Sequence, residues 1–184
     1  MPAGKKRCYS ILAPDTLPRL KQAGVPLSYD FSLEFTEEDI RMQCPHLEAA
    51  FFSCGHMGNS ELRRTLSLAC RCGCTLAVAT RGAEGSVLYD GKQWMEQPAY
   101  RINPVDTMGA GDSFIARFIQ CYADGMLRKK GLLAELKLLG KPAPELPEYE
   151  TILLRYCLSQ AALFSANNCL YSGAFGHSQP LEET

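Results

Sequence analysis

The sequence lacks the features that would place the protein in a membrane, on nucleic acid or in the secretory pathway. It contains no run of about 18 apolar residues, the length that a membrane-spanning helix needs. The formal net charge is -1, so the chain as a whole offers no basic surface to nucleic acid. The basic start MPAGKKRCYSILAPDTLP has only a short apolar run, which Pro14 and Asp15 interrupt, and this is a poor secretory signal. We therefore expect a cytoplasmic protein without membrane or nucleic-acid partners.

What the sequence does contain is typical of one globular domain over residues 1–184. Hydrophobic residues make up 46% of the chain and charged residues 21%, a balance found in folded soluble proteins. A chain of 184 residues is also long enough to bury a sizeable core. No internal repeat divides it into smaller units.

The nine cysteines need an explanation of their own. An odd number without a secretory signal favours reduced thiols over a disulfide framework. Two segments suggest metal ligands: the pairs Cys44/His46 and Cys54/His56, and the run Cys70, Cys72 and Cys74. Structural zinc sites use ligand pairs separated by two to four residues, and the closer Cys-x-His spacing would strain a tetrahedron. We therefore favour buried apolar cysteines and leave the role of residues 44–74 open.

The first 100 residues show strands alternating with helices. We predict a first helix over 15–24. A second, short helix should begin after Thr36, which forms a capping box with Asp39. A third is predicted over 59–73, where Leu62, Leu66 and Ala69 share one face. Strands are expected near 26–31, 49–55 and 74–82, the last apolar on both faces. Residues 85–100 read as a hairpin with its turn at Asp90-Gly91. This order predicts an α/β layered domain whose central sheet is mostly parallel and flanked by helices.

The remaining chain is predicted to be mainly helical. The charged segment 128–150 carries prolines at 142, 144 and 147, which favours a helix followed by a proline-rich surface loop. The stretch TILLRYCLSQAALFSANN, residues 151–168, is apolar nearly all round and should form a buried helix. The polar residues 177–184 read as a mobile tail.

The segment NPVDTMGAGDSF, residues 103–114, carries the chemistry. A helix that begins near Gly109 to Asp112 directs unpaired N–H groups and its positive dipole end into the preceding loop. The amides of Gly109, Ala110 and Gly111 would then form an anion hole, with Asp112 beside it as a base. Phosphoryl transfer needs both, because negative charge spreads over the transferred group while the acceptor hydroxyl loses a proton. The alternative is structural: Asp112 caps the helix and the glycines make a turn.

Two familiar phosphate-binding loops are excluded at this position. The Rossmann pattern G-x-G-x-x-G fails because Phe114 stands where its last glycine is required. A Walker A loop fails because no Gly-Lys-Ser/Thr follows.

The contiguous segment DTMGAGDSF, residues 106–114, resembles the second signature of the pfkB family of carbohydrate kinases, which have the ribokinase-like fold. Two further segments extend the resemblance. TRGAEGSVLYDG, residues 80–91, is similar to the family's strand and turn near the nucleotide phosphates, and AALFSANNCLYSGAFG, residues 161–176, to its closing helix and loop beside the adenine. YDFS at 29–32 and YSGAFG at 171–176 are similar to the fructoselysine 6-kinase branch.

The resemblance implies a role for each matching residue. Asp112 matches the catalytic base, and Gly109, Ala110 and Gly111 match the anion hole. The implied ligands are ATP, Mg2+ and a sugar or sugar-amine substrate. Asp106 with Thr107 corresponds to the place where many members hold a monovalent cation such as K+. The positions that match the nucleotide site are Thr80, Gly82, Gly85, Gly173 and Ala174.

The sequence departs from the family pattern in three ways. Arg117 stands where the family usually has a small residue, although it should lie off the apolar face of its helix. The family's N-x-x-E motif has no clean match, since Asn59 and Glu61 have the wrong spacing and are better explained by a helix start. The resemblance covers only the C-terminal portion of a family member, so the expected fold is incomplete at its N-terminal side.

Three functions remain open on this basis. The first is an ATP-dependent sugar kinase, active only if a missing N-terminal half is supplied elsewhere; the partner of the chain would be that half or a second copy in a homo-oligomer. The second is a non-catalytic, nucleotide-binding relic of such a kinase. The third is an interaction protein in which Gly109 to Asp112 only make a tight turn. The implied base and anion hole favour the first two.

Overall fold

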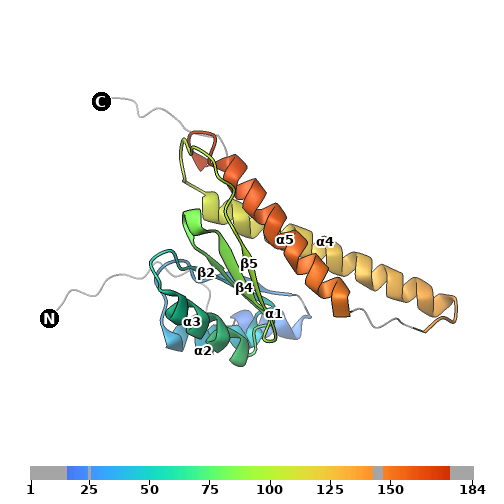
Figure 1. Ribbon diagram of the computed structural model, residues 1–184. Helices are drawn as coiled ribbons and strands as arrows, with labels where there is room; N and C mark the ends of the chain where they lie inside the picture. The colour runs from blue at the N-terminus through green and yellow to red at the C-terminus, as the bar shows by residue number, and fades with distance from the viewer. Residues whose placement is uncertain (1–15, 25, 143–146, 175–184) are drawn as a thin grey trace, which may run out of the picture.

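The computed structural model describes residues 16–24, 26–142 and 147–174, and shows a sheet with helices on both of its faces (Figure 1). The expected tail, residues 177–184, lies outside the described residues. The helices are α1 (Thr16–Gln22), α2 (Glu37–Gln43), α3 (Asn59–Arg71), α4 (Ala110–Leu138) and α5 (Pro147–Asn168), with short 3-10 turns η1 (Cys44–His46) and η2 (Gly82–Glu84). The strands are β1 (Ser28–Asp30), β2 (Ala49–Ser53), β3 (Leu76–Thr80), β4 (Ser86–Tyr89) and β5 (Trp94–Gln97).

The five strands form one sheet in the order β1-β2-β3-β4-β5. The pairs β1–β2 and β2–β3 are parallel, as expected for strands joined through helices. The pair β4–β5 is antiparallel because it forms the predicted hairpin, and the pair β3–β4 is antiparallel because only residues 81–85 join the two strands. The sheet is therefore mixed, with its parallel part at β1 to β3. The carboxyl ends of these three strands share one edge of the sheet.

Alternation along the central strands divides the core into two layers. Phe52 and Ala77 point to the face covered by α2 and α3, whereas Phe51 and Val78 point to the face covered by α4 and α5. Leu62, Leu66 and Ala69 of α3 are all buried, as their spacing predicted. Both faces of β2 and β3 are thus covered, which accounts for their continuous apolar sequences.

Two local signals form as the sequence predicted. Thr36 caps α2 by accepting the Asp39 N–H at 3.2 Å, and the Asp39 carboxylate accepts the Thr36 N–H at 2.8 Å. In the hairpin turn, Asp90 Oδ1 accepts the N–H groups of Lys92 and Gln93 at 2.9 and 2.7 Å. Gly91 supplies the positive φ of 84° that this turn requires.

Helices α4 and α5 form an antiparallel pair that extends beyond the sheet (Figure 1). α4 continues without a break from Ala110 to Leu138, so residues 128–138 prolong it rather than form a separate short helix. α5 buries Leu154, Cys157, Leu158 and Ala161 but exposes apolar side chains on its opposite side, so the expectation of a buried helix holds for one face only. Within the described ranges, no helix is long and apolar enough to cross a membrane.

Eight of the cysteines lie in the described part of the chain as free thiols. Burial raises the pKa of Cys54 to about 11 and that of Cys70 to about 12. The neighbouring Cys74 thiol, more than burial, raises the pKa of Cys44. Across residues 16–24, 26–142 and 147–174, no three His, Cys, Asp or Glu side chains come together to hold a metal ion.

Candidate active site

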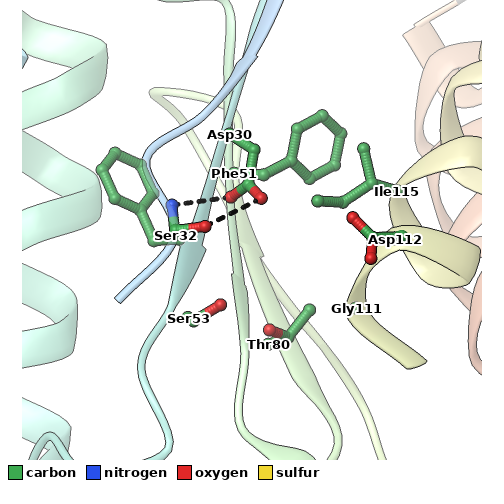
Figure 2. A pocket seen from close by; sticks show the side chains of 9 residues that line it. Asp30, Ser32, Phe51, Ser53, Thr80, Gly111, Asp112 and Ile115 are labelled. Carbon is green, nitrogen blue, oxygen red and sulfur yellow. Dashed lines mark hydrogen bonds between the residues drawn. The ribbon is translucent and has the colours of Figure 1, made fainter. Parts of the chain in front are cut away.

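The carboxyl ends of the three parallel strands open into a small cavity opposite the start of α4 (Figure 2). Asp30, Ser53 and Thr80 are the last residues of β1, β2 and β3, and each lines this cavity. Gly111 and Asp112 line it from the first turn of α4. The cavity has a volume of about 170 Å³. This edge of a parallel sheet is where α/β proteins usually bind ligands.

A larger cavity of about 560 Å³ adjoins the first. It lies between the η2 turn, the chain after β5 and the sides of α4 and α5, and its walls are mostly apolar. Its lining includes Ile102, Phe114 and Ala162. The size and the lining are typical of a pocket for a small organic ligand. Thr80 and Gly111 line both cavities, so the two meet at these residues.

Ser86 is a buried polar residue at the wall of the larger cavity. Its side chain lines the cavity, and the residue is only 3% exposed. Its hydroxyl has no hydrogen-bond partner within the part of the chain that the structure describes. A buried hydroxyl without a hydrogen-bond partner is costly, so Ser86 is a polar group that the fold leaves unsatisfied.

The end of α5 holds the loop before α4 in place. Cys169 O accepts the Val105 N–H at 2.8 Å, and the Asn168 amide donates to Met108 O at 2.9 Å. Ser165 donates to Ala110 O at 2.8 Å. These contacts position the Gly109–Asp112 segment from outside its own helix.

The backbone at the start of α4 matches the anion hole expected from the sequence only in part. Gly109 is the N-cap residue and has a left-handed φ of 72°. The Ala110 N–H donates to Thr107 O at 3.2 Å, so it is already engaged. The N–H groups of Gly109, Gly111 and Asp112 donate to no acceptor within the described chain. Gly111 and Asp112 also line the small cavity, and their amides are therefore the free donors nearest to it.

The side chain of Asp112 makes no capping contact. The N-cap is Gly109, and no side chain hydrogen-bonds to the first turn as a cap. Asp112 is exposed toward the small cavity and forms no ion pair within the described residues (Figure 2). The carboxylate is thus positioned by the helix and left available to a ligand.

Asp106 links the loop before α4 to the loop after α5. Its Oδ1 accepts the Met108 N–H and its Oδ2 the Gly173 N–H, both at 2.9 Å. These two backbone donors, Met108 first, lower the pKa of Asp106 below the ordinary value of 3.8. Both carboxylate oxygens therefore serve the fold, and a monovalent cation at Asp106 stays a prediction.

The predicted nucleotide-side residues separate into two groups. Gly82 and Gly85 line the larger cavity together with Thr80. Gly85 has a φ of 96°, and a Cβ there would lie 2.1 Å from Gln97 O, so only glycine fits. Gly173 and Ala174 are not among the residues that line either cavity, but a Cβ on Gly109 would lie 3.1 Å from Ala174 Cβ. Both residues contact the loop before α4, Ala174 through Gly109 and Gly173 through Asp106.

The departures from the family pattern are accommodated away from the cavities. Arg117 lies off the apolar face of α4, as expected, and donates to Gln120 and to Gln160 of α5 at 3.0 and 3.3 Å. Asn59 and Glu61 begin α3, whose N-cap is Gly58, and neither lines a cavity.

Sequence reasoning missed Asp30, Ser32 and Ser53 as site residues. Each follows or ends a strand, and only the pairing of β1, β2 and β3 brings them to Asp112. The available signal was their place at the carboxyl ends of predicted parallel strands.

Comparison with known proteins relates this chain to a kinase family. Residues 55–132 match the pfkB family carbohydrate kinases. The chain is 32% identical over 156 residues to fructosamine kinase FrlD of Bacillus subtilis, a match that covers 85% of this chain and 46% of that protein. It is 35% identical over 114 residues to fructoselysine 6-kinase of Escherichia coli, covering 62% of this chain and 43% of that protein.

The fold comparison agrees with the sequence matches. The structure of Arabidopsis thaliana ribokinase complexed with ribose and ATP superposes with a TM-score of 0.59 at 18% identity, over 88% of this chain and 47% of that one. The chain spans about half the length of the relatives that it matches. Through residues 55–132 and through these relatives, the chain is related to the pfkB family of carbohydrate kinases, and its fold is ribokinase-like.

Proposed function

We propose that this chain carries the phosphoryl-transfer centre of an ATP-dependent kinase that phosphorylates a hydroxyl of a sugar or sugar derivative, of the fructosamine type. The observation that carries the proposal is the junction of the two cavities at Thr80 and Gly111. A nucleotide in the larger cavity would direct its terminal phosphate through this junction. It would reach an acceptor hydroxyl beside Asp112 in the smaller one.

The residues at the junction suit the transfer step. The free amides of Gly111 and Asp112, at the positive end of the α4 dipole, would stabilise the negative charge on the transferred phosphoryl group. The Asp112 carboxylate would accept the proton of the attacking hydroxyl. Magnesium, when bound, would neutralise phosphate charge. It would come with the nucleotide's phosphates, since Mg2+ commonly takes only one or two protein carboxylates.

The substitution Asp112→Asn tests the proposal in a protein that carries this segment. Asparagine keeps the size of the side chain but cannot accept the hydroxyl proton. We expect turnover of fructosamine or fructose with ATP to fall by about 10²- to 10⁴-fold. Nucleotide affinity from calorimetry and the melting temperature should not change, because Asp112 makes no structural hydrogen bond. Near-full turnover in the variant would rule out Asp112 as the base.

A non-catalytic nucleotide-binding protein is the second candidate. The observation that favours it is that the larger cavity, lined by the expected nucleotide-side residues Thr80, Gly82 and Gly85, is about three times the volume of the cavity beside Asp112. It predicts that the unmodified chain binds ATP or ADP at millimolar concentration with magnesium but transfers no phosphate to any sugar. Binding without turnover in a longer protein that carries this segment would therefore select this candidate over the kinase.

A further inference from the structure

The wall of the small cavity on the β1 side is formed by the turn from Asp30 to Ser32, whereas Asp112 borders the cavity from α4 (Figure 2). Asp30 Oδ1 accepts the Ser32 N–H at 2.7 Å, and Oδ2 accepts the Ser32 hydroxyl at 3.2 Å. Ser32 has a φ of 53°, the left-handed value that a serine seldom adopts. The turn therefore holds the Asp30 carboxylate in one orientation at the end of β1.

Asp30 retains hydrogen-bonding capacity and negative charge after these contacts. A carboxylate offers about four lone-pair sites, and the two contacts with Ser32 leave about half of them unused. Within the described residues no Lys, Arg or His forms an ion pair with Asp30. The lining of the small cavity also includes no cationic side chain.

The two carboxylates face different chemical surroundings within this cavity. Asp112 lies beside the amides of the α4 N-terminus, which favour an anion such as a phosphoryl group. Asp30 lies at the strand side, in contact with the hydroxyl of Ser32, and does not line the larger cavity. A ligand group at Asp30 is therefore favoured when it is a hydrogen-bond donor with positive charge.

We infer that Asp30 determines substrate specificity by accepting a hydrogen bond from the protonated amine of an amino-sugar substrate. This inference rests on the proposed kinase function and names the substrate class for the same site. A neutral sugar would gain only an ordinary hydrogen bond from Asp30, whereas an ammonium group gains a charge-assisted one of about twice the strength. In a fructosamine the amine on C1 and the hydroxyl on C6 lie at opposite ends of the sugar. Asp30 and Asp112 can then contact opposite ends of one molecule.

The experiment compares Asp30→Asn with the unmodified protein on two acceptors, fructosamine and fructose, at saturating ATP. Asparagine keeps an oxygen that can accept the Ser32 N–H, so the turn is retained while the charge is removed. We expect KM for fructosamine to rise by about ten- to a hundredfold, the size of a lost hydrogen bond to a charged group. KM for fructose and KM for ATP should stay within about twofold, as for a neutral contact.

Asp90→Asn is the matched control. The Asp90 carboxylate likewise accepts the backbone N–H groups of residues two and three positions later. Asp90 follows β4, at the end of that strand far from Ser86 and the larger cavity. It lines neither cavity, and it should leave both acceptors unaffected. The melting temperatures of both variants verify that they fold. A further variant, Ser32→Gly, removes the hydroxyl that contacts Asp30 but keeps the turn, because glycine readily adopts a positive φ.

The outcomes separate this inference from the proposal on which it rests. A rise of KM for both acceptors by the same factor, or no change, would overturn the role of Asp30 in amine recognition. A change confined to the magnesium dependence would assign Asp30 to the metal and also overturn it. Failure of a longer protein that carries this segment, with its N-terminal half present, to phosphorylate either acceptor would instead contradict the proposed function itself.

Discussion

At the scale of single residues, Gly111 is a position where the fold would tolerate a side chain but the proposed phosphate site would not. It lines both cavities, yet a Cβ at this position would meet no atom within 4 Å. Its backbone is helical, so alanine fits without strain and should stabilise the fold by about 0.4–1 kcal/mol. The same methyl group would project where phosphate approaches the backbone, and displacement of about 1 Å can cost 10²-fold in rate.

We therefore predict that Gly111→Ala raises the melting temperature but lowers kcat/KM for ATP by at least about tenfold. Gly131→Ala is the matched control, because Gly131 lies in the same helix, also in open space, and lines no cavity. It should stabilise without a kinetic effect. Equal kinetics in the two variants, measured by steady-state assay with thermal unfolding alongside, would contradict phosphate binding at Gly111.

Asp106 predicts a pH dependence of stability. The amides of Met108 and Gly173 lower its pKa, so the ionised form is favoured in the folded state. Its stabilising contribution is complete above the ordinary pKa of 3.8 and is lost as the pH falls through the lowered folded value. Asp106→Asn should lower the melting temperature at pH 7, and the difference from the unmodified chain should shrink below about pH 3.8. Calorimetric scans from pH 7 to pH 3 measure the difference in melting temperature. A difference that stays constant with pH would contradict a role for the ionised Asp106 carboxylate in holding Met108 and Gly173.

The sequence was sufficient to nominate residues whose chemistry is local. Asp112 and Gly111 are adjacent in the chain, and a helix start alone implies their amides and charge. Asp30 and Ser32 could not be nominated in this way, because about 80 residues and the register of three strands separate them from Asp112. The engagement of the Ala110 amide by Thr107 likewise depends on the exact path of the loop.

At the scale of secondary-structure elements, the packing of α4 against α5 depends on Gly125. Gly125 is buried, and a Cβ there would lie 2.2 Å from Leu153 Cδ1. Its carbonyl also accepts the Tyr149 hydroxyl at 2.8 Å. The absence of a side chain at this position brings the two helices close together.

We predict that Gly125→Val destabilises the protein by about 1–3 kcal/mol, the usual cost of overpacking a tight core. Adding Leu153→Ala should recover part of the loss, because the smaller side chain makes room for valine. Urea unfolding of the two single variants and the double variant measures the coupling. Additive losses would mean that the two residues do not limit the approach of the helices.

The limits of helix and strand prediction show in the same two elements. The charged residues 128–138 were expected to be helical, and they are, but the sequence did not predict that they continue α4 without a break to Leu138. The apolar sequence of α5 indicated burial, but Ile152, Tyr156 and Leu163 are 64%, 52% and 48% exposed. Hydrophobic periodicity reports how apolar a face is and not whether a neighbour covers it.

At the scale of the whole molecule, the order of strands and helices was enough to predict the layered fold. The position of the two cavities, by contrast, depends on how those elements pack against one another. The alternation of strands and helices was enough to predict helices on both faces of the sheet. The junction of the two cavities at Thr80 and Gly111 was not predictable, since it requires β3, α4 and α5 to be placed together. Function at this site is therefore a property of tertiary packing rather than of the glycine motif alone.

Exposed apolar side chains on α5 lead to a last prediction, about how the isolated chain associates. Ile152, Tyr156 and Leu163 follow one another at spacings of four and seven residues, so they form one stripe along α5, opposite its buried face. β1, in addition, has a single neighbouring strand within the described residues, and such an edge can pair with another chain.

We expect the 184-residue chain to self-associate at micromolar concentration, because burial of this stripe and edge against a second copy removes apolar surface from water. Ile152→Glu combined with Leu163→Glu should shift sedimentation velocity toward the monomer, since both positions are exposed and the fold does not require their side chains. Arg155→Glu, a charge change at an exposed position beside the stripe, is the control and should not have this effect. If the unmodified chain sediments as a monomer at all concentrations and melts at high temperature, the stripe is tolerated in water and this expectation is wrong.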